Sequence, residues 1–154
     1  KITQHIDLQA YGPSDSRDRL ADYTAGGNDI EHILADSADA DAVEEFGDRG
    51  QDQEVIQSLG NLLLIEKSIN RSISNRPYSE KIKSYGQSKF LLTRCQADKG
   101  AQMVGIADKI TKTVQTLDHW PSWSAADVEA RQSFVTKLAC QVWDVPIVPE
   151  PKAP

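Results

Sequence analysis

The most apolar segment of the chain is the run Leu-Gly-Asn-Leu-Leu-Leu-Ile at residues 59–65. Its length, and the glycine near its start, favour a buried strand over a helix. A second strand is predicted at residues 29–34, where apolar residues flank His32. Between them lie the acidic residues 35–54, which we expect to form a long surface loop with one helical turn at 40–46. The sequence therefore predicts a strand, a long loop and a second strand.

Most of the remaining chain is predicted to be helical. Pro77 is suited to a first helical position, and Ser124 with Asp127 resembles a capping box at the start of the last helix. Helices are expected at 16–23, 68–74, 77–85, 88–96, 101–118 and 124–142, and a short strand at 2–8. The predicted fold class is α+β and mainly helical, with one domain over residues 1–144 and a Pro-rich, disordered tail at 145–154.

Charge is unevenly distributed along the chain. The 154 residues carry a net charge of −6, yet residues 60–100 contain eight Lys or Arg against three Asp or Glu, a net of +5. This segment could present a basic face to phosphates, although a solvated helix face would look the same. No apolar run approaches the roughly 18 residues that span a bilayer, so no membrane segment is expected.

The two cysteines and the single methionine place the chain in a cellular context. Cys95 and Cys140 fit no metal spacing, which excludes a structural zinc site of four cysteines. Two free thiols are typical of a cytoplasmic protein. The chain contains Met103 but does not begin with Met, and we interpret it as a piece of a longer protein.

The residues that could carry chemistry occur in a fixed order. Glu31 and His32 end the first predicted strand, Asn61 opens the second, and Asn70 follows on a short helix. This order is the layout of the ββα-metal finger. Hydrolysis of a phosphodiester needs a base that takes a proton from water, and a neutral imidazole suits that role near pH 7. It also needs a hard cation on the phosphate, for which carboxylate and amide oxygens are suitable ligands.

The sequence resembles the C-terminal nuclease domain of GmrSD-type restriction systems, an HNH-related family of modification-sensing phage defence. Related domains end the nicking component of phosphorothioate-linked defence systems. The resemblance covers roughly residues 28–144. It departs from the family at Ala35, where proline is usual, and in the acidic loop. The matching residues are 30–34, 60–70, 74–81, 92–94, Tyr85, Ser88, Trp123, Arg131 and Trp143.

The resemblance implies a ββα-metal (His-Me finger) core at about residues 28–81, surrounded by helices. It implies that His32 is the general base that activates water, that Asn61 braces the catalytic loop, and that Asn70 binds Mg²⁺ or Mn²⁺. Glu31 matches an acid that also contacts the metal. Strand alternation would send Glu31 and His32 to opposite faces, so Asp29 is a second candidate ligand.

The resulting functional hypothesis is a metal-dependent DNA endonuclease or nickase domain of a restriction and anti-phage defence protein. The family also implies an N-terminal nucleotide-hydrolysing domain in the same parent protein. The alternative is a catalytically silent DNA-binding or regulatory module, which the acidic loop favours. A structural RNA-binding domain would need stacking aromatics in a motif that is not visible. The expected DNA contacts are Lys67, Arg71, Arg76 and Lys81.

Overall fold

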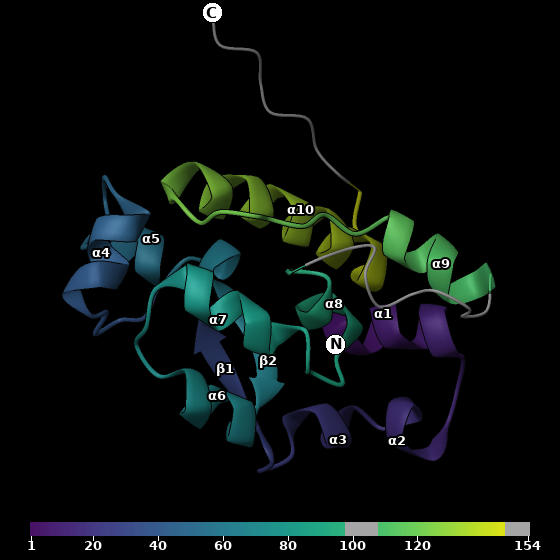
Figure 1. The fold of residues 1–154 in the computed structure, drawn as a ribbon. Helices are drawn as coiled ribbons and strands as arrows, with labels where there is room; N and C mark the ends of the chain where they lie inside the picture. The colour runs from purple at the N-terminus through teal and green to yellow at the C-terminus, as the bar shows by residue number, and fades with distance from the viewer. Residues whose placement is uncertain (98–107, 147–154) are drawn as a thin grey trace, which may run out of the picture.

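A computed structural model describes residues 1–97 and 108–146, and it is mainly helical with one small sheet (Figure 1). The sheet pairs β1 (Asn28–His32) with β2 (Leu62–Glu66) in antiparallel fashion, with His32 opposite Leu62 and Asn28 opposite Glu66. The predicted α+β class and both predicted strands are confirmed. The strands end where the chain turns into the acidic connection and into α6.

Helices surround this sheet on several sides (Figure 1). Helix α6 follows β2 directly and contacts both strands, while the long α10 crosses the other end of the hairpin. The helical segments are α1 (Ile2–Tyr11), α2 (Asp15–Asp18), α3 (Leu20–Thr24), α4 (Ala40–Phe46), α5 (Gln53–Ile56), η1 (Leu59–Asn61), α6 (Lys67–Ile73), α7 (Tyr78–Tyr85), α8 (Leu91–Arg94), α9 (Asp108–Gln115) and α10 (Ala125–Trp143).

The N-terminal segment is a helix, so the predicted strand at residues 2–8 is wrong. Ile2, Ile6 and Leu8 alternate with polar residues, which suggested a strand. The spacing of four between Ile2, Ile6 and Ala10 also places these residues on one face of a helix. In α1 this face packs against α8, α9 and α10, where Ile6 joins the buried Leu117 in a hydrophobic cluster. Tertiary packing therefore decided between two patterns that the segment could satisfy.

The acidic connection between the strands is more ordered than predicted. It contains α4, as expected, and also α5. Phe46 of this connection, and Val55 and Ile56 at its end, are buried in the main core. They anchor the connection to the core, while the acidic residues face solvent.

The predicted strand at 59–65 begins three residues late, because residues 59–61 form the 3₁₀ helix η1. Gly60 packs against the backbone of α10 here. A Cβ at Gly60 would lie 2.1 Å from the carbonyl oxygen of Val128, which leaves no room for any side chain. The glycine therefore serves the close approach of η1 to α10.

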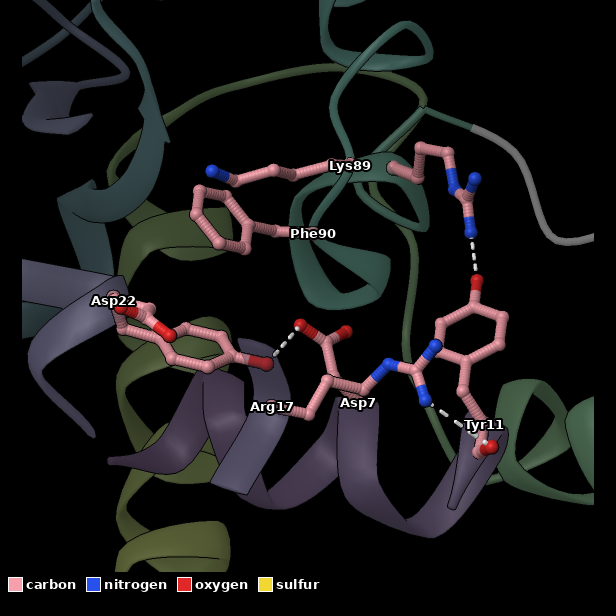
Figure 2. Close-up of a pocket in the computed structure, with 8 residues that line it drawn as sticks. Asp7, Tyr11, Arg17, Asp22, Lys89 and Phe90 are labelled. Carbon is pink, nitrogen blue, oxygen red and sulfur yellow. Dashed lines mark hydrogen bonds between the residues drawn. The ribbon is translucent and has the colours of Figure 1, made fainter. Parts of the chain in front are cut away.

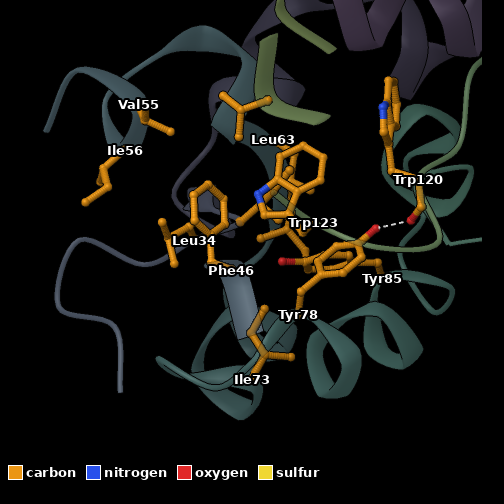
Figure 3. Packing of buried hydrophobic residues seen from close by; sticks show 13 residues of the cluster. Leu34, Phe46, Val55, Ile56, Leu63, Ile73, Tyr78, Tyr85, Trp120 and Trp123 are labelled. Atoms are coloured by element: carbon orange, nitrogen blue, oxygen red, sulfur yellow. Dashed lines mark hydrogen bonds between the residues drawn. The ribbon is translucent and has the colours of Figure 1, made fainter. Parts of the chain in front are cut away.

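The main core is rich in aromatic residues (Figure 3). The rings of Tyr78 and Trp123 stack with centroids 5.5 Å apart, and Trp120 meets Trp123 edge to face at 6.3 Å. Trp120 and Trp123 are both buried in this core, whereas Trp143 is half exposed. The core thus fills the space between the hairpin, α7 and the start of α10.

The helices predicted near the C-terminus are largely present. The Ser124 side chain accepts a hydrogen bond from the Asp127 N–H, which confirms the predicted cap of α10. The predicted helix at 88–96 is shorter, since only α8 is helical there. Residues 98–107, where the next predicted helix begins, and residues 147–154 of the predicted tail lie outside the described residues. Neither Cys95 nor Cys140 forms a disulfide.

Membrane insertion finds no support in the helices that are described. Between residues 1 and 97 and between 108 and 146, no helix combines the length and apolar character needed to cross a bilayer.

Candidate active site

A cleft of about 370 Å³ lies at the end of β1, beside the following loop and α6. It brings together Glu31, His32, Asn70 and Arg71, four residues that the sequence analysis assigned to the site. It is thus the place where the predicted base and the predicted metal ligand meet. The lining residues are Ile30, Glu31, His32, Ala35, Asp36, Ser37, Asn70, Arg71, Ser74 and Asn75.

His32 is oriented by a chain of polar side chains. Its Nε2 lies 3.2 Å from Oε1 of Gln57, and Nε2 of Gln57 donates to Oδ1 of Asp36 at 3.3 Å. An ionised carboxylate only accepts hydrogen bonds, so Asp36 fixes the amide with its nitrogen outward and its oxygen toward the imidazole. The amide oxygen in turn requires a proton on Nε2. The neutral tautomer therefore leaves Nδ1 of His32 as the basic atom.

Asn61 is completely buried and ties three segments together. Its Nδ2 donates to the carbonyls of Leu34 (2.9 Å) and Ile56 (2.8 Å). Its Oδ1 accepts from the Leu34 N–H at 2.8 Å and from Nε1 of Trp123 at 3.1 Å. All four bonds are buried, and they join the segment after β1, the end of α5 and the segment just before α10 through one side chain. Asn61 fixes the backbone that follows His32 and does not itself line the cleft.

Glu31 points away from His32, as strand alternation requires. Its Oε1 accepts a 2.7 Å bond from Nζ of Lys81 and a 3.2 Å bond from the Tyr85 hydroxyl. Burial raises the pKa of the Glu31 carboxyl, and the Lys81 ammonium opposes that rise. Nζ of Lys81 also donates to the carbonyls of His32 and Ile33, each at 3.1 Å. The Glu31–Lys81 pair thereby holds the backbone at the end of β1 in place.

This geometry changes the interpretation of two predicted site residues. The side chain of Lys81 has no exposed surface, so it has no surface from which to contact a DNA phosphate. We therefore correct that prediction and assign Lys81 to the scaffold. Glu31 forms part of the cleft wall, but its carboxylate is committed to Lys81 inside the core. Glu31 and Asn70 thus line the same cleft, but Oε1 of Glu31 is already hydrogen-bonded to Lys81 and Tyr85.

Asp29 and Asn70 are brought together on the α6 side of β1. Nδ2 of Asn70 lies 3.4 Å from Oδ2 of Asp29, and Nζ of Lys67 lies 3.8 Å from Oδ1. Of the other predicted DNA contacts, Arg71 is exposed on the cleft wall. Arg76 is exposed farther along and lies 3.7 Å from Glu80.

The donor set can be compared with what a divalent cation needs. Within the described part of the chain, no three His, Cys, Asp or Glu side chains are grouped as for a metal ion. Mg²⁺, however, is commonly held by only one or two protein carboxylates and keeps several waters. The carboxylate of Asp29 and the amide of Asn70 supply oxygen atoms that suit a hard cation, provided that the Asn70 amide turns its oxygen, in place of Nδ2, toward Asp29.

Two residues that support the site were not among the predicted site residues. Gln57 could not be found from sequence, because it is a polar residue at the end of a short helix. Arg131 is almost fully buried, and its NH1 donates to the carbonyls of Gly60 and Leu62 at 2.7 Å each, on either side of Asn61. Burial lowers its pKa to about 10. Its spacing from Val128 and Val135 on one face of α10 was a signal that it faces the core.

Comparison with known proteins gives one match. A family model described as the C-terminal domain of GmrSD restriction endonucleases matches residues 2–138. No curated protein and no solved structure matches the chain.

Proposed function

The chain belongs to the family of C-terminal domains of GmrSD restriction endonucleases, and from this we propose that it hydrolyses DNA phosphodiesters with His32 as the general base. DNA is the substrate that a restriction endonuclease domain implies. The observation that carries the proposal is the chain from Asp36 through Gln57 to His32 at the mouth of a cleft that also contains Asn70. In this proposal β1, β2 and α6 form the His-Me finger.

The role of His32 follows from its hydrogen bonds. Nδ1 takes the proton from water as the water attacks the phosphorus, because Nε2 is already protonated toward Gln57. The resulting imidazolium donates from Nε2 to the amide oxygen of Gln57. The same amide donates to the Asp36 carboxylate, which is the next group in the chain.

Asn70 and Asp29 are the residues that would hold Mg²⁺ or Mn²⁺. When bound, such an ion supplies positive charge against the charge that develops on the phosphate and the leaving oxygen. The neutral amide of Asn70 makes the site weak, so metal is required at high micromolar to millimolar concentration. The carboxylate of Asp29 would also exchange its contact with Lys67 for the cation.

Surface cations near the cleft would position the DNA. Arg71 on the cleft wall is the first candidate for a phosphate contact, followed by Lys67 and Arg76 on the same side of the chain. The acidic connection carries Asp36 into the cleft wall, where its charge serves the histidine. Recognition of modified DNA, and control by an N-terminal nucleotide-hydrolysing domain of the parent protein, are part of the proposal through the family alone.

The test is nicking of supercoiled plasmid by the wild-type protein with Mg²⁺, with Mn²⁺ or with chelator. We expect nicking that requires metal, and a loss of about 10² to 10⁴ in rate for His32→Ala. His119→Ala, which removes an exposed histidine outside the cleft, is the matched control and should retain the wild-type rate. DNA binding without nicking in any metal would instead indicate the catalytically silent module.

A further inference from the structure

A second cavity of about 400 Å³ lies at the other end of the hairpin, between the N-terminal helices and α8 (Figure 2). It is separate from the cleft, since the two share no lining residue. Its volume lies in the range of pockets that hold small ligands. The lining residues are Asp7, Tyr11, Arg17, Asp22, Tyr23, Lys89, Phe90 and Arg94.

Three cations from different elements face this pocket (Figure 2). Arg17 from α2 donates to the carbonyls of Tyr11 (3.3 Å) and Gly12 (2.8 Å). Arg94 at the end of α8 donates to the Tyr11 hydroxyl. Nζ of Lys89 lies 4.8 Å from the centre of the Phe90 ring. None of these hydrogen-bond or ring partners is anionic; the nearest opposing charge is the Asp7 carboxylate, on which the charges of Arg94 and Arg17 act to lower the pKa against the effect of burial.

The two carboxylates of the pocket are engaged elsewhere. Asp7 is buried at the base of the pocket, where it accepts hydrogen bonds from the Tyr23 hydroxyl and the Leu91 N–H, each at 3.0 Å. Asp22 is paired with Arg19 at 3.1 Å. Three cations against two engaged carboxylates leave an excess of positive charge. Tyr11, Tyr23 and Phe90 add ring surface, so the wall suits a ligand that joins an anion to a flat or apolar part.

Helix α6 connects this pocket to the cleft. At the start of α6, the backbone N–H of Lys67 donates to the carbonyl of Gly27, in the segment that follows α3. The carboxylate of the preceding residue, Glu66, accepts from the backbone N–H of Lys89 at 2.7 Å. One turn later, Arg71 lies on the cleft wall, and residues four apart lie on one helix face. Arg71, Lys67 and Lys89 therefore lead from the cleft toward the pocket.

We propose that this pocket, with Arg17, Lys89 and Arg94, binds a nucleotide phosphate of the DNA strand that leaves the cleft along α6. The proposal rests on the proposed function for the identity of the strand. A free nucleotide offers the same chemistry, a phosphate joined to a sugar and a base. The row of cations from Arg71 through Lys67 to Lys89 favours the strand, because a strand carries a phosphate on every nucleotide and can contact several cations at once, whereas a free nucleotide contacts the pocket alone. The aromatic wall then contacts the sugar or base of the same nucleotide.

The test measures DNA binding in the His32→Ala protein, so that cleavage plays no part. The logarithm of the binding constant for a duplex is measured against the logarithm of salt concentration, with and without Lys89→Gln and Arg94→Gln. Loss of the pocket's one phosphate contact in the double variant should flatten this slope by about 0.9, and Lys89→Gln alone should flatten it by part of that amount. Lys83→Gln with Lys137→Gln, two exposed cations outside both sites, is the matched control and should leave the slope unchanged.

A competing arm uses a deoxynucleoside monophosphate. We expect Lys89→Gln to change DNA binding, and a millimolar mononucleotide to leave it largely unaffected. Mononucleotide binding that depends on Lys89, beside an unchanged DNA slope, would reject the DNA strand as the source. If the Lys89 and Arg94 variants gave the same salt slope as the control pair, and the mononucleotide did not bind, the proposal that this pocket binds a phosphate would be overturned. Lys89→Gln alone decides the question if Arg94→Gln lowers the melting temperature.

A failure of the nuclease proposal would look different. Wild-type protein would then fail to nick plasmid in any metal, while the salt slope would still depend on Lys89. The two proposals can therefore fail independently.

Discussion

Glu31 and His32 are neighbours on β1, yet they belong to two polar networks that differ in almost every respect. The Glu31 carboxylate is buried and accepts hydrogen bonds from Lys81 and Tyr85. The Lys81 ammonium also donates to a backbone carbonyl at the end of β1. His32 stands at the open cleft and has one partner chain through Gln57. The difference shows how one strand can serve both scaffold and chemistry. The buried network fixes the backbone, and in the proposed function the open network is the one that reacts.

The largest effect is expected from breaking the buried network. Lys81→Met leaves the Glu31 carboxylate in the core without its counter-charge, which typically costs about 3–5 kcal/mol of unfolding free energy. Lys83→Met, an exposed lysine on the same helix, should change stability by less than about 0.5 kcal/mol. Chemical denaturation of both variants measures the difference. A double variant that also carries Glu31→Leu should recover much of the loss, and equal effects of the two lysines would contradict the buried network.

The pH dependence of this variant sharpens the comparison. Burial already raises the pKa of Glu31 above its unfolded value, and Lys81 is the charge that opposes the rise. Without Lys81 the folded pKa rises further, so the folded state binds the proton more tightly than the unfolded state does. The stability deficit of Lys81→Met should therefore be smallest below the unfolded pKa and should grow as pH rises through the folded pKa.

An intermediate effect is expected in the open network for Asn70→Ala. Loss of one oxygen ligand should raise the Mg²⁺ concentration for half-maximal nicking by about tenfold or more, since even groups behind a ligand change metal affinity by 10–100-fold. Mn²⁺ should restore part of the activity, because it binds such sites more tightly than Mg²⁺. Ser68→Ala, on the exposed face of α6, is the control. A lower melting temperature with an unchanged metal titration would make Asn70 a structural residue.

The smallest effect is expected for Gln57→Ala. The hydrogen bond to His32 contributes about 1 kcal/mol, which corresponds to roughly a five- to tenfold change in rate. Gln53→Ala, one turn earlier on α5 and exposed, should nick at the wild-type rate. Single-turnover nicking is the measurement, since it isolates the chemical step. If the two variants behave alike, Gln57 does not orient the imidazole.

The sequence predicted the features that local pattern decides. The two strands and the cap of α10 follow from apolar runs and from a serine with an acid three residues later. The burial of Lys81 was not predicted, because its charge suggested a place on the surface of the molecule. Its spacing with Tyr78 and Tyr85 in fact places it on the buried face of α7. Spacing was the better guide, since a counter-charge on a distant strand can compensate for burial.

Other parts of the site depend on contacts between distant segments. Gln57 reaches His32 across 25 residues, because Val55 and Ile56 anchor α5 in the core beside the strand end. No local pattern marks Gln57 as a partner. The pocket at Lys89 and Arg94 likewise draws on four segments, including a helix that was predicted as a strand. Neither arrangement could be found before the fold was known.

The central claim is that His32 acts as the base while its neighbour Glu31 holds the strand. The most direct test is rescue of nicking in His32→Gly by added imidazole, with His119→Gly as the control and melting temperatures measured in parallel. The account predicts a very low rate for His32→Gly, a rise with imidazole concentration in that variant alone, and a nearly unchanged melting temperature. A His32→Gly protein that nicks at the wild-type rate without imidazole would contradict it.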